Sequence, residues 1–524
     1  MPASAQPDGD AISTSSSRAS SVRASDAGGA SSGTPGSPTG LLLRNAPLVV
    51  LGEAVPAVAA VVAMPLLVAS LGVDRLGVLT LAWVVIGYFG MFDLGIGRAT
   101  TQLVSARLAA GAHADVPGVV RTSMVLLLAL GCAGGAVLAA LAPWLVGGAL
   151  RLPEELARES LGALRVLALT VPLVVLSSGL RGVLEARRRF AALAALRAAL
   201  GVISFLGPLL VIPFSRSVLA VVVVLAAGRV VLLAVSALLC RDVLRAPTVP
   251  GARLDRAVAH ELVRFGGWLT VSNALSPLLV LLDRFVVGAV VSVGAVAFYA
   301  TPLELVQRAG VVPIAIGTVL FPAMAASALT DPAHARALFT SAVRLCLLGV
   351  FPILVVLVLW SHEGLELWLG AEFARESTSV VRWIAPGLLV NAVGAAAIVA
   401  LQASGRPDLP AKFHVLELLG YAPLLWILAS RYGVEGAAIA WSVRVAVDAL
   451  LLMLAALQIF PLAPRTVLRL LAAVGGGLAT LAVASIVVST GAKIGVTGLV
   501  IAAAAVLAVR LVPAARRAAH EAAR

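Results

Sequence analysis

Long apolar runs, separated by short polar stretches, follow one another along this chain from about residue 45 to residue 513. A helix of about 20 residues rises far enough to cross the roughly 30 Å hydrocarbon core of a bilayer. The runs do not alternate apolar and polar residues, as the strands of a membrane barrel do. The pattern predicts an all-α polytopic membrane protein with about 14 transmembrane helices, near 45–69, 76–98, 120–148, 161–181, 191–214, 216–240, 266–289, 293–325, 338–360, 378–401, 411–430, 434–458, 464–490 and 492–512.

The composition supports this class and excludes several others. Apolar residues make up 60% of the 524 residues and charged residues 12%, which leaves too little polar surface for a soluble protein. The net charge of +13 comes from scattered basic residues without interleaved aromatics, so we expect no nucleic-acid partner. The six His and three Cys residues show no metal-ligand spacing, and no phosphate-binding glycine loop is present. We therefore expect neither a metal nor another cofactor.

The basic residues predict the topology. With an even number of spans and the N-terminus inside, about 26 of the 39 Lys and Arg residues fall on the cytoplasmic side and about 9 outside, as the positive-inside rule requires. Both termini are therefore expected in the cytoplasm. Residues 1–40 are rich in Ser, Ala, Gly and Pro and predict a disordered cytoplasmic tail.

A weak internal repeat suggests how the spans are grouped. Arg229 begins an Arg-Val-Val-Leu segment in the sixth span, and Arg444 begins an Arg-Val-Ala-Val segment in the twelfth, about 215 residues later. Such repeats are typical of transporters, whose sites lie between the repeated halves. We expect two six-helix lobes, at 41–245 and 246–460, followed by two extra helices and a cytoplasmic tail at 461–524.

Charged residues within the spans are the best functional candidates. Each costs about 2.5–3.5 kcal/mol near the bilayer centre, so it should face the protein interior or water. Glu304 with Arg308, and Arg444 with Asp448, have helical i, i+4 spacing and are interpreted as structural ion pairs. Arg229 has no nearby acid in its own span, which favours contact with an anionic substrate.

Guanidinium groups bind phosphate oxygens bidentately, and acids beside them could neutralise the empty site or carry protons. Arg98 and Arg181, near cytoplasmic span ends, could alternatively extend to the lipid headgroups. The candidate substrate-binding residues are Arg98, Arg181, Arg229, Arg284, Arg308 and Arg444. The candidate coupling or ion-pair residues are Glu53, Asp93, Asp283, Glu304 and Asp448.

Several short motifs in order along the chain resemble those of one transporter family. They are FDLGIGR at 92–98, RFGGW at 264–268, LDRF at 282–285, LFP at 320–322, LWLG at 367–370 and GVEGAA at 433–438. Between about residues 41 and 460 the chain resembles the Wzx-like oligosaccharide flippases of polysaccharide biosynthesis. These belong to the MOP superfamily, together with the MATE drug exporters and the lipid II flippases.

The resemblance implies two MATE-like lobes around a cationic cavity that opens alternately to the two sides of a bacterial inner membrane. It implies that the protein is not an enzyme, and that it moves a polyprenyl-diphosphate-linked anionic oligosaccharide from the cytoplasmic to the outer leaflet. Asp93, Asp283 and Arg284 match the motifs. Membrane lipid and polysaccharide polymerase and export proteins are the implied partners. Proton or sodium coupling is implied as well, and the proton is the family's expectation.

Three alternatives remain open from the sequence. A MATE-like drug antiporter and a lipid II flippase would share the fold, although a site for cationic drugs would need fewer arginines. A membrane glycan polymerase or ligase would usually carry a sizeable catalytic outside loop, and the longest one expected here runs only from Trp360 to Ser377.

Overall fold

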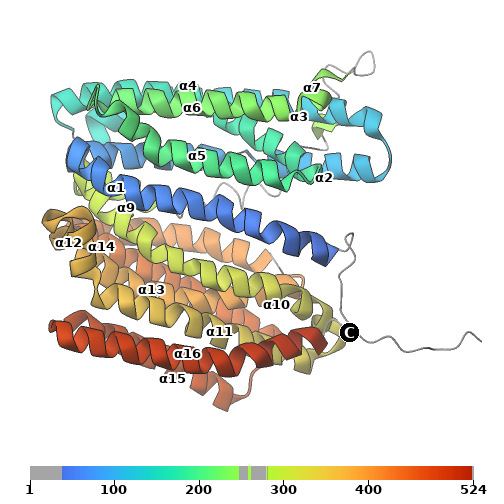
Figure 1. Ribbon diagram of the computed structural model, residues 1–524, viewed down its shortest axis with the longest axis vertical. Helices are drawn as coiled ribbons and strands as arrows, with labels where there is room; N and C mark the ends of the chain where they lie inside the picture. Colours follow the sequence, from blue (N-terminus) through green and yellow to red (C-terminus); the bar gives the residue numbers. More distant parts are fainter. Residues whose placement is uncertain are drawn as a thin grey trace, which may run out of the picture. The chain divides into compact units, whose positions relative to one another are not determined.

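The computed structural model describes residues 38–91, 93–150, 152–246, 258–260, 262, 279, 281–406 and 408–521. Every regular element in these residues is a helix, which confirms the all-α prediction (Figure 1). The elements are α1 (Pro38–Met91), α2 (Ile96–Ala109), η1 (His113–Asp115), α3 (Val116–Trp144), η2 (Leu145–Ala149), α4 (Glu154–Ala186), α5 (Phe190–Val211), α6 (Val218–Leu239), α7 (Arg241–Arg245), α9 (Val293–Gln307), η3 (Arg308–Gly310), α10 (Val311–Thr330), α11 (Pro332–Leu359), α12 (Ser361–Leu369), α13 (Ala371–Ala403), α14 (Asp408–Ile459), α15 (Pro464–Ile486) and α16 (Thr490–Glu521).

Within the described residues, 10 helices are long and apolar enough to cross a membrane. The chain is therefore a multi-pass membrane protein. Two of the helices are too long for one crossing, because α1 has 54 residues and α14 has 52, and a straight helix of that length would measure about 80 Å. Gly72 interrupts α1 and Gly433 interrupts α14, each between two predicted spans. The predicted span at 266–289 lies mostly outside the described residues, so the number of about fourteen stays a prediction.

The interruption of α14 folds its two arms back against each other. Gly433 has a φ of 59°, a left-handed conformation that glycine adopts without strain. Three residues later, Gly436 lies so close to the Leu428 carbonyl that a β-carbon would collide with it. The two glycines therefore let residues 408–432 and 434–459 form a tight helical hairpin, which brings side chains from both arms together.

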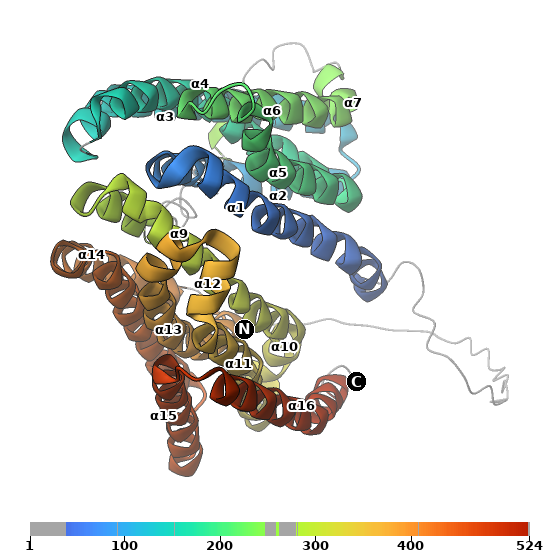
Figure 2. The same ribbon diagram turned by 60° about the vertical axis from the view of Figure 1, so that its left-hand side comes forward.

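The helices pack in two sets of neighbours (Figures 1 and 2). Helices α2–α7 contact one another, with α4 lying along α3 and α6, and we call them the N-terminal group. Helices α9–α16 also contact one another, with α13 central and with α15 and α16 packed on α11, and we call them the C-terminal group. The lobe boundaries expected at residues 245 and 460 stay a prediction.

Helix α1 contacts helices of both groups. Pro56 packs against Gly201 of α5, and beyond the break Gly77 packs against Val293 of α9. The apolar side chains of the second arm of α1, such as Leu76 and Leu79, are buried in the same core as α9.

One predicted loop is helical. The segment from Trp360 to Ser377 was expected to be an outside loop because it separates two apolar runs, but it forms α12 and the first turns of α13. Gly370, with a φ of 94°, separates the two helices. The predicted disordered tail at 1–40 lies almost entirely outside the described residues.

Candidate functional site

The motif at residues 93–97 builds a tight turn between α1 and α2. Leu94 and Gly95 have positive φ angles of 50° and 73°. The Asp93 carboxylate accepts hydrogen bonds from the backbone amides of Gly95 at 2.9 Å and Gly97 at 3.1 Å. A carboxylate there stabilises the positive end of the helix dipole of α2. Asp93, expected as a coupling or ion-pair group, thus holds the start of this helix.

Gly97 packs closely against its neighbours. A β-carbon there would collide with the Asp93 carboxylate and approach Ser178 of α4. On the facing helix, Gly182 lies against the Gly97 carbonyl. The motif therefore joins α2 to the part of α4 that carries Arg181.

Two guanidinium groups lie in the N-terminal group. Arg181 on α4 and Arg229 on α6 are both half-buried, and their positive charges repel each other. Arg181 also interacts electrostatically with Asp93 and Glu185. Arg229 forms no ion pair with any residue that the structure describes, whereas Arg98 on α2 is exposed. Glu53 lies in α1, and its side chain is outside the described part.

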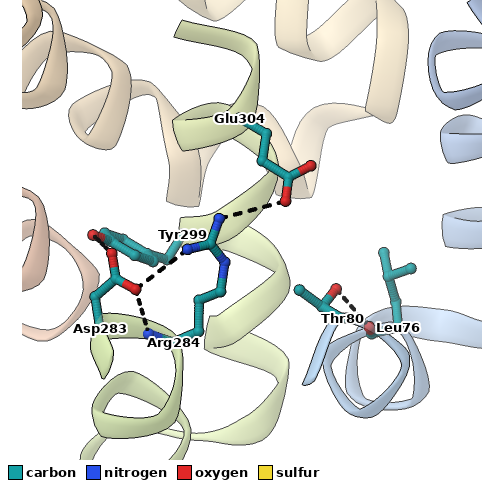
Figure 3. A network of polar contacts seen from close by, with 6 residues as sticks. All are labelled: Leu76, Thr80, Asp283, Arg284, Tyr299 and Glu304. Carbon is teal, nitrogen blue, oxygen red and sulfur yellow. Dashed lines mark hydrogen bonds and ion pairs between the residues drawn. The ribbon is translucent and has the colours of Figure 1, made fainter. Parts of the chain in front are cut away.

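A buried polar network joins Asp283 and Arg284, which come before α9 in the chain, to Tyr299 and Glu304 on α9 (Figure 3). The Asp283 side chain is 0% exposed, and the Tyr299 hydroxyl donates to its Oδ2 at 2.8 Å. Arg284, 4% exposed, lies 3.3 Å from Asp283 Oδ1 through Nη1 and 3.4 Å from Glu304 Oε1 through Nη2. Buried charges need such compensation, so the three predicted residues stabilise one another. The expected pair of Glu304 with Arg308 is wrong, because Glu304 binds Arg284 instead.

A second cluster forms between the two arms of α14. Glu417 comes from the first arm, with its side chain 2% exposed, and Arg444 and Asp448 come from the second. Arg444 Nη1 lies 3.5 Å from Glu417 Oε2, and the guanidinium also lies over the Tyr421 ring, 5.3 Å from its centroid. His414 Nε2 is 3.9 Å from Asp448 Oδ1. The expected pair of Arg444 with Asp448 is therefore replaced by a pair with Glu417.

A cavity of about 490 Å³ connects the two clusters. Glu304 of the Asp283 network and Arg444 of the α14 cluster both line it. Its other polar lining comes from Gln307, Arg308 and Asn391, with the Trp441 indole beside them. Arg308 makes no ion pair with the residues described here, so its charge is available to a ligand. Two guanidiniums, a carboxylate, two amides and an indole are suited to an anionic, hydroxyl-rich ligand.

At the predicted cytoplasmic end, basic residues hold α7 in place. Arg187 forms an ion pair with Asp242 of α7, and Arg121 donates to the Ala246 carbonyl at 2.7 Å. The hydrogen bond from Arg187 lowers the pKa of Asp242 below its usual value. This contact fixes where the chain leaves the N-terminal group.

We expect the Asp242 ion pair to stabilise the protein only while the carboxyl is ionised. A lowered native pKa makes the stabilisation complete above the usual carboxyl range, near pH 4, and removes it as the pH falls through the native pKa. The side chain is 51% exposed, so the effect should be at most about 1 kcal/mol. Asp242→Asn should melt below the wild type near pH 6 and converge with it in acid. A constant gap in Tm between them would contradict this.

The sequence of this chain is similar to one protein family and to a transporter of known sequence. The sequence profile of a family described as polysaccharide biosynthesis proteins matches residues 67–377. The "Putative O-antigen transporter" of Shigella flexneri is 29% identical over 412 residues, which are 78% of this chain and 96% of that protein.

Two solved structures share the architecture. An inward-facing multidrug resistance MATE family transporter of the MOP superfamily matches with a TM-score of 0.65 over 81% of this chain and 98% of its own, at 14% identity. The lipid II flippase MurJ in an inward closed conformation matches with a TM-score of 0.67 over 90% of this chain and 100% of its own, at 13% identity. At such identities the likeness establishes the fold alone.

Proposed function

Because the chain belongs to the polysaccharide biosynthesis protein family, we propose that it is a flippase for a lipid-linked oligosaccharide. It would carry a polyprenyl-diphosphate-linked sugar unit from the cytoplasmic to the outer leaflet by alternating access between two six-helix lobes. The O-antigen transporter to which it is similar supports a transporter rather than an enzyme. We place it in the bacterial cytoplasmic membrane with both termini inside, in line with the charge distribution.

The observation that carries this proposal is the half-buried guanidinium of Arg229, which has no ion-pair partner among the described residues. Arg229 and Arg308 form no ion pair with described residues, and Arg181 repels Arg229. An uncompensated guanidinium within a membrane is costly, so an anionic ligand would lower its energy. A diphosphate between Arg181 and Arg229 would neutralise the like-charged pair through charge-assisted hydrogen bonds. A site for cationic drugs would need the opposite charge.

The cavity in the C-terminal group is suited to the sugar part. Asn391 and Gln307 can hydrogen-bond hydroxyl groups, Trp441 offers an aromatic face, and Arg308 can hold an acidic substituent. In this arrangement the sugars occupy hydrated space while the polyprenyl chain stays in lipid.

The α14 cluster is our candidate for coupling. Glu417 and Asp448 face a single guanidinium, Arg444, so with both acids ionised and His414 neutral the buried cluster has one excess negative charge. Binding one proton neutralises it, which is how two close carboxyl groups usually resolve such a conflict. Because Arg444 also lines the cavity, a proton at the cluster changes the charge that a substrate meets.

The test uses the full chain in liposomes that contain a fluorescent undecaprenyl-diphosphate oligosaccharide. We follow how quickly the label becomes accessible to a quencher outside. Arg229→Ala should slow this movement about 10- to 100-fold, as expected for one lost charge-assisted contact. The matched control is Arg216→Ala, which removes an exposed arginine just before the same helix.

Two results would contradict the proposal. One is protein-independent movement of the label. The other is a protein that does not move the labelled lipid but drives efflux of a cationic dye along a proton gradient, which would favour a drug antiporter. Equal movement of lipid II and the oligosaccharide would show that the protein is a flippase that accepts several lipid-linked glycans.

A further inference from the structure

Helix α1 contains a carbonyl group that its own backbone cannot satisfy. In an α-helix the Val61 carbonyl would accept from the amide of residue 65. That residue is Pro65, which has no amide hydrogen. The indole Nε1 of Trp368, on α12, donates to this carbonyl at 2.8 Å. A side chain more than 300 positions away therefore replaces the missing helical hydrogen bond.

This hydrogen bond joins the first arm of α1 to the C-terminal group. The arm of α1 before Gly72 lies against α5 of the N-terminal group, through Gly52 with Ala194 and Pro56 with Gly201. Trp368 belongs to the C-terminal group, because α12 packs on α13 and α11.

Further contacts between α1 and the C-terminal group lie just beyond the break, at the predicted outer end of the spans. Gly294 lies against Asp74, and Gly77 lies against the Val293 backbone. Glycine is needed at position 77, because a β-carbon there would collide with the Val293 backbone. The described structure is therefore closed at this end, and Val293 is buried in the contact.

We propose that Trp368 is a latch that holds the outer side closed by binding the carbonyl exposed by Pro65. The inference rests on the alternating access of the proposed function, since outward opening must separate α1 from the C-terminal group. A single side-chain hydrogen bond at an exposed helix face suits such a role. When it opens, water can take the place of both partners, so the latch costs little to release. Pro65 thus leaves the Val61 carbonyl without its helical donor. The Trp368 indole then satisfies this carbonyl only while the outer side is closed.

The test measures opening directly and needs no substrate. In a full-length background with Cys132, Cys240 and Cys346 replaced by alanine, Val293→Cys serves as the reporter. A membrane-impermeant maleimide is applied to the outer face, and the labelling rate is recorded. Trp368→Phe keeps the ring but removes the donor, and it should raise the rate about 2- to 10-fold, the range of one net hydrogen bond.

Pro65→Ala provides a second, independent variant. Alanine supplies the missing amide, so the Val61 carbonyl regains its helical partner and no longer needs the indole. This variant should raise labelling as much as Trp368→Phe, although it strengthens the helix. The double variant should label no faster than either single one, because both remove the same bond.

Trp360→Phe is the matched control. The Trp360 indole, next to the start of α12, donates to Thr497 of α16 at 3.1 Å and does not reach α1. Its labelling rate should stay at the wild-type value. Unchanged labelling in Trp368→Phe and Pro65→Ala, or additive increases in the double variant, would overturn the latch. Because no lipid-linked sugar is present, either result leaves the flippase proposal to its own test.

Discussion

Asp283→Ala is expected to lower the free energy of unfolding by about 3–5 kcal/mol, the range for breaking one side of a buried charge pair. The substitution removes the fully buried acid partner of Arg284 and the acceptor of the Tyr299 hydroxyl. Of the two acid contacts that the described residues give this guanidinium, which is 4% exposed, the one to Glu304 at 3.4 Å then remains. Chemical or thermal unfolding in detergent measures the loss.

Two substitutions test whether the buried charge is responsible. Glu304→Gln removes the other acid of Arg284, but that side chain is 43% exposed, so water can compensate and the loss should be well under half as large. Asp283→Asn keeps an acceptor for Tyr299 and should fall between the two. If Asp283→Ala unfolds at the wild-type temperature, the network does not stabilise the fold.

The fold class could be predicted from the sequence because it depends on local properties. Each span is recognisable from its own 20 or so apolar residues, and the breaks at Gly72 and Gly433 coincide with polar or glycine positions between runs. The Asp93 motif was also visible. That the Asp93 carboxylate stabilises the start of α2 could not be predicted, because this role depends on the positive φ angles of Leu94 and Gly95.

The ion pairs could not be predicted, because the spacing along one helix does not say whether a charged side chain binds a residue of its own helix or one of a neighbouring helix. Glu304 and Arg308 have i, i+4 spacing, but the α-helix ends at Gln307 and Arg308 begins a tighter 3₁₀ turn. The Arg308 backbone amide still donates to the Glu304 carbonyl, so the backbone does not separate the two residues and the side chain of Glu304 turns to another partner. Arg284, which is 20 positions before Glu304, is brought close by the packing of neighbouring helices.

In the α14 cluster, too, the spacing along the chain does not predict the ion pair. Arg444 and Asp448 lie in an uninterrupted helical arm, yet Arg444 binds Glu417, which is 27 positions earlier in the chain. Only the hairpin at Gly433 brings the two arms together. Glu417 is an acid in an apolar run of the sequence, but it was not among the candidate residues. His414 was considered only as a possible metal ligand, and Tyr421 carries no charge that would single it out within a span.

Neutralising the α14 acids is expected to abolish the response of transport to a proton gradient. With Glu417→Gln or Asp448→Asn, the cluster has one acid for one guanidinium and no excess negative charge for a proton to cancel. The flipping rate with a gradient should then fall to the rate without one. We expect a loss of about 5- to 150-fold, the range of one typical allosteric coupling energy.

The matched control is Asp408→Asn, an exposed acid at the start of the same helix that pairs with Arg406 and Lys412 outside the cluster. It should keep the full response to the gradient. The two cluster variants should not add to each other, because either one alone removes the excess charge. A gradient response that survives in both variants would exclude this cluster as the coupling site. A sodium-driven rate that they leave intact would identify a different ion and a different site, while the diphosphate contact at Arg181 and Arg229 would remain testable separately.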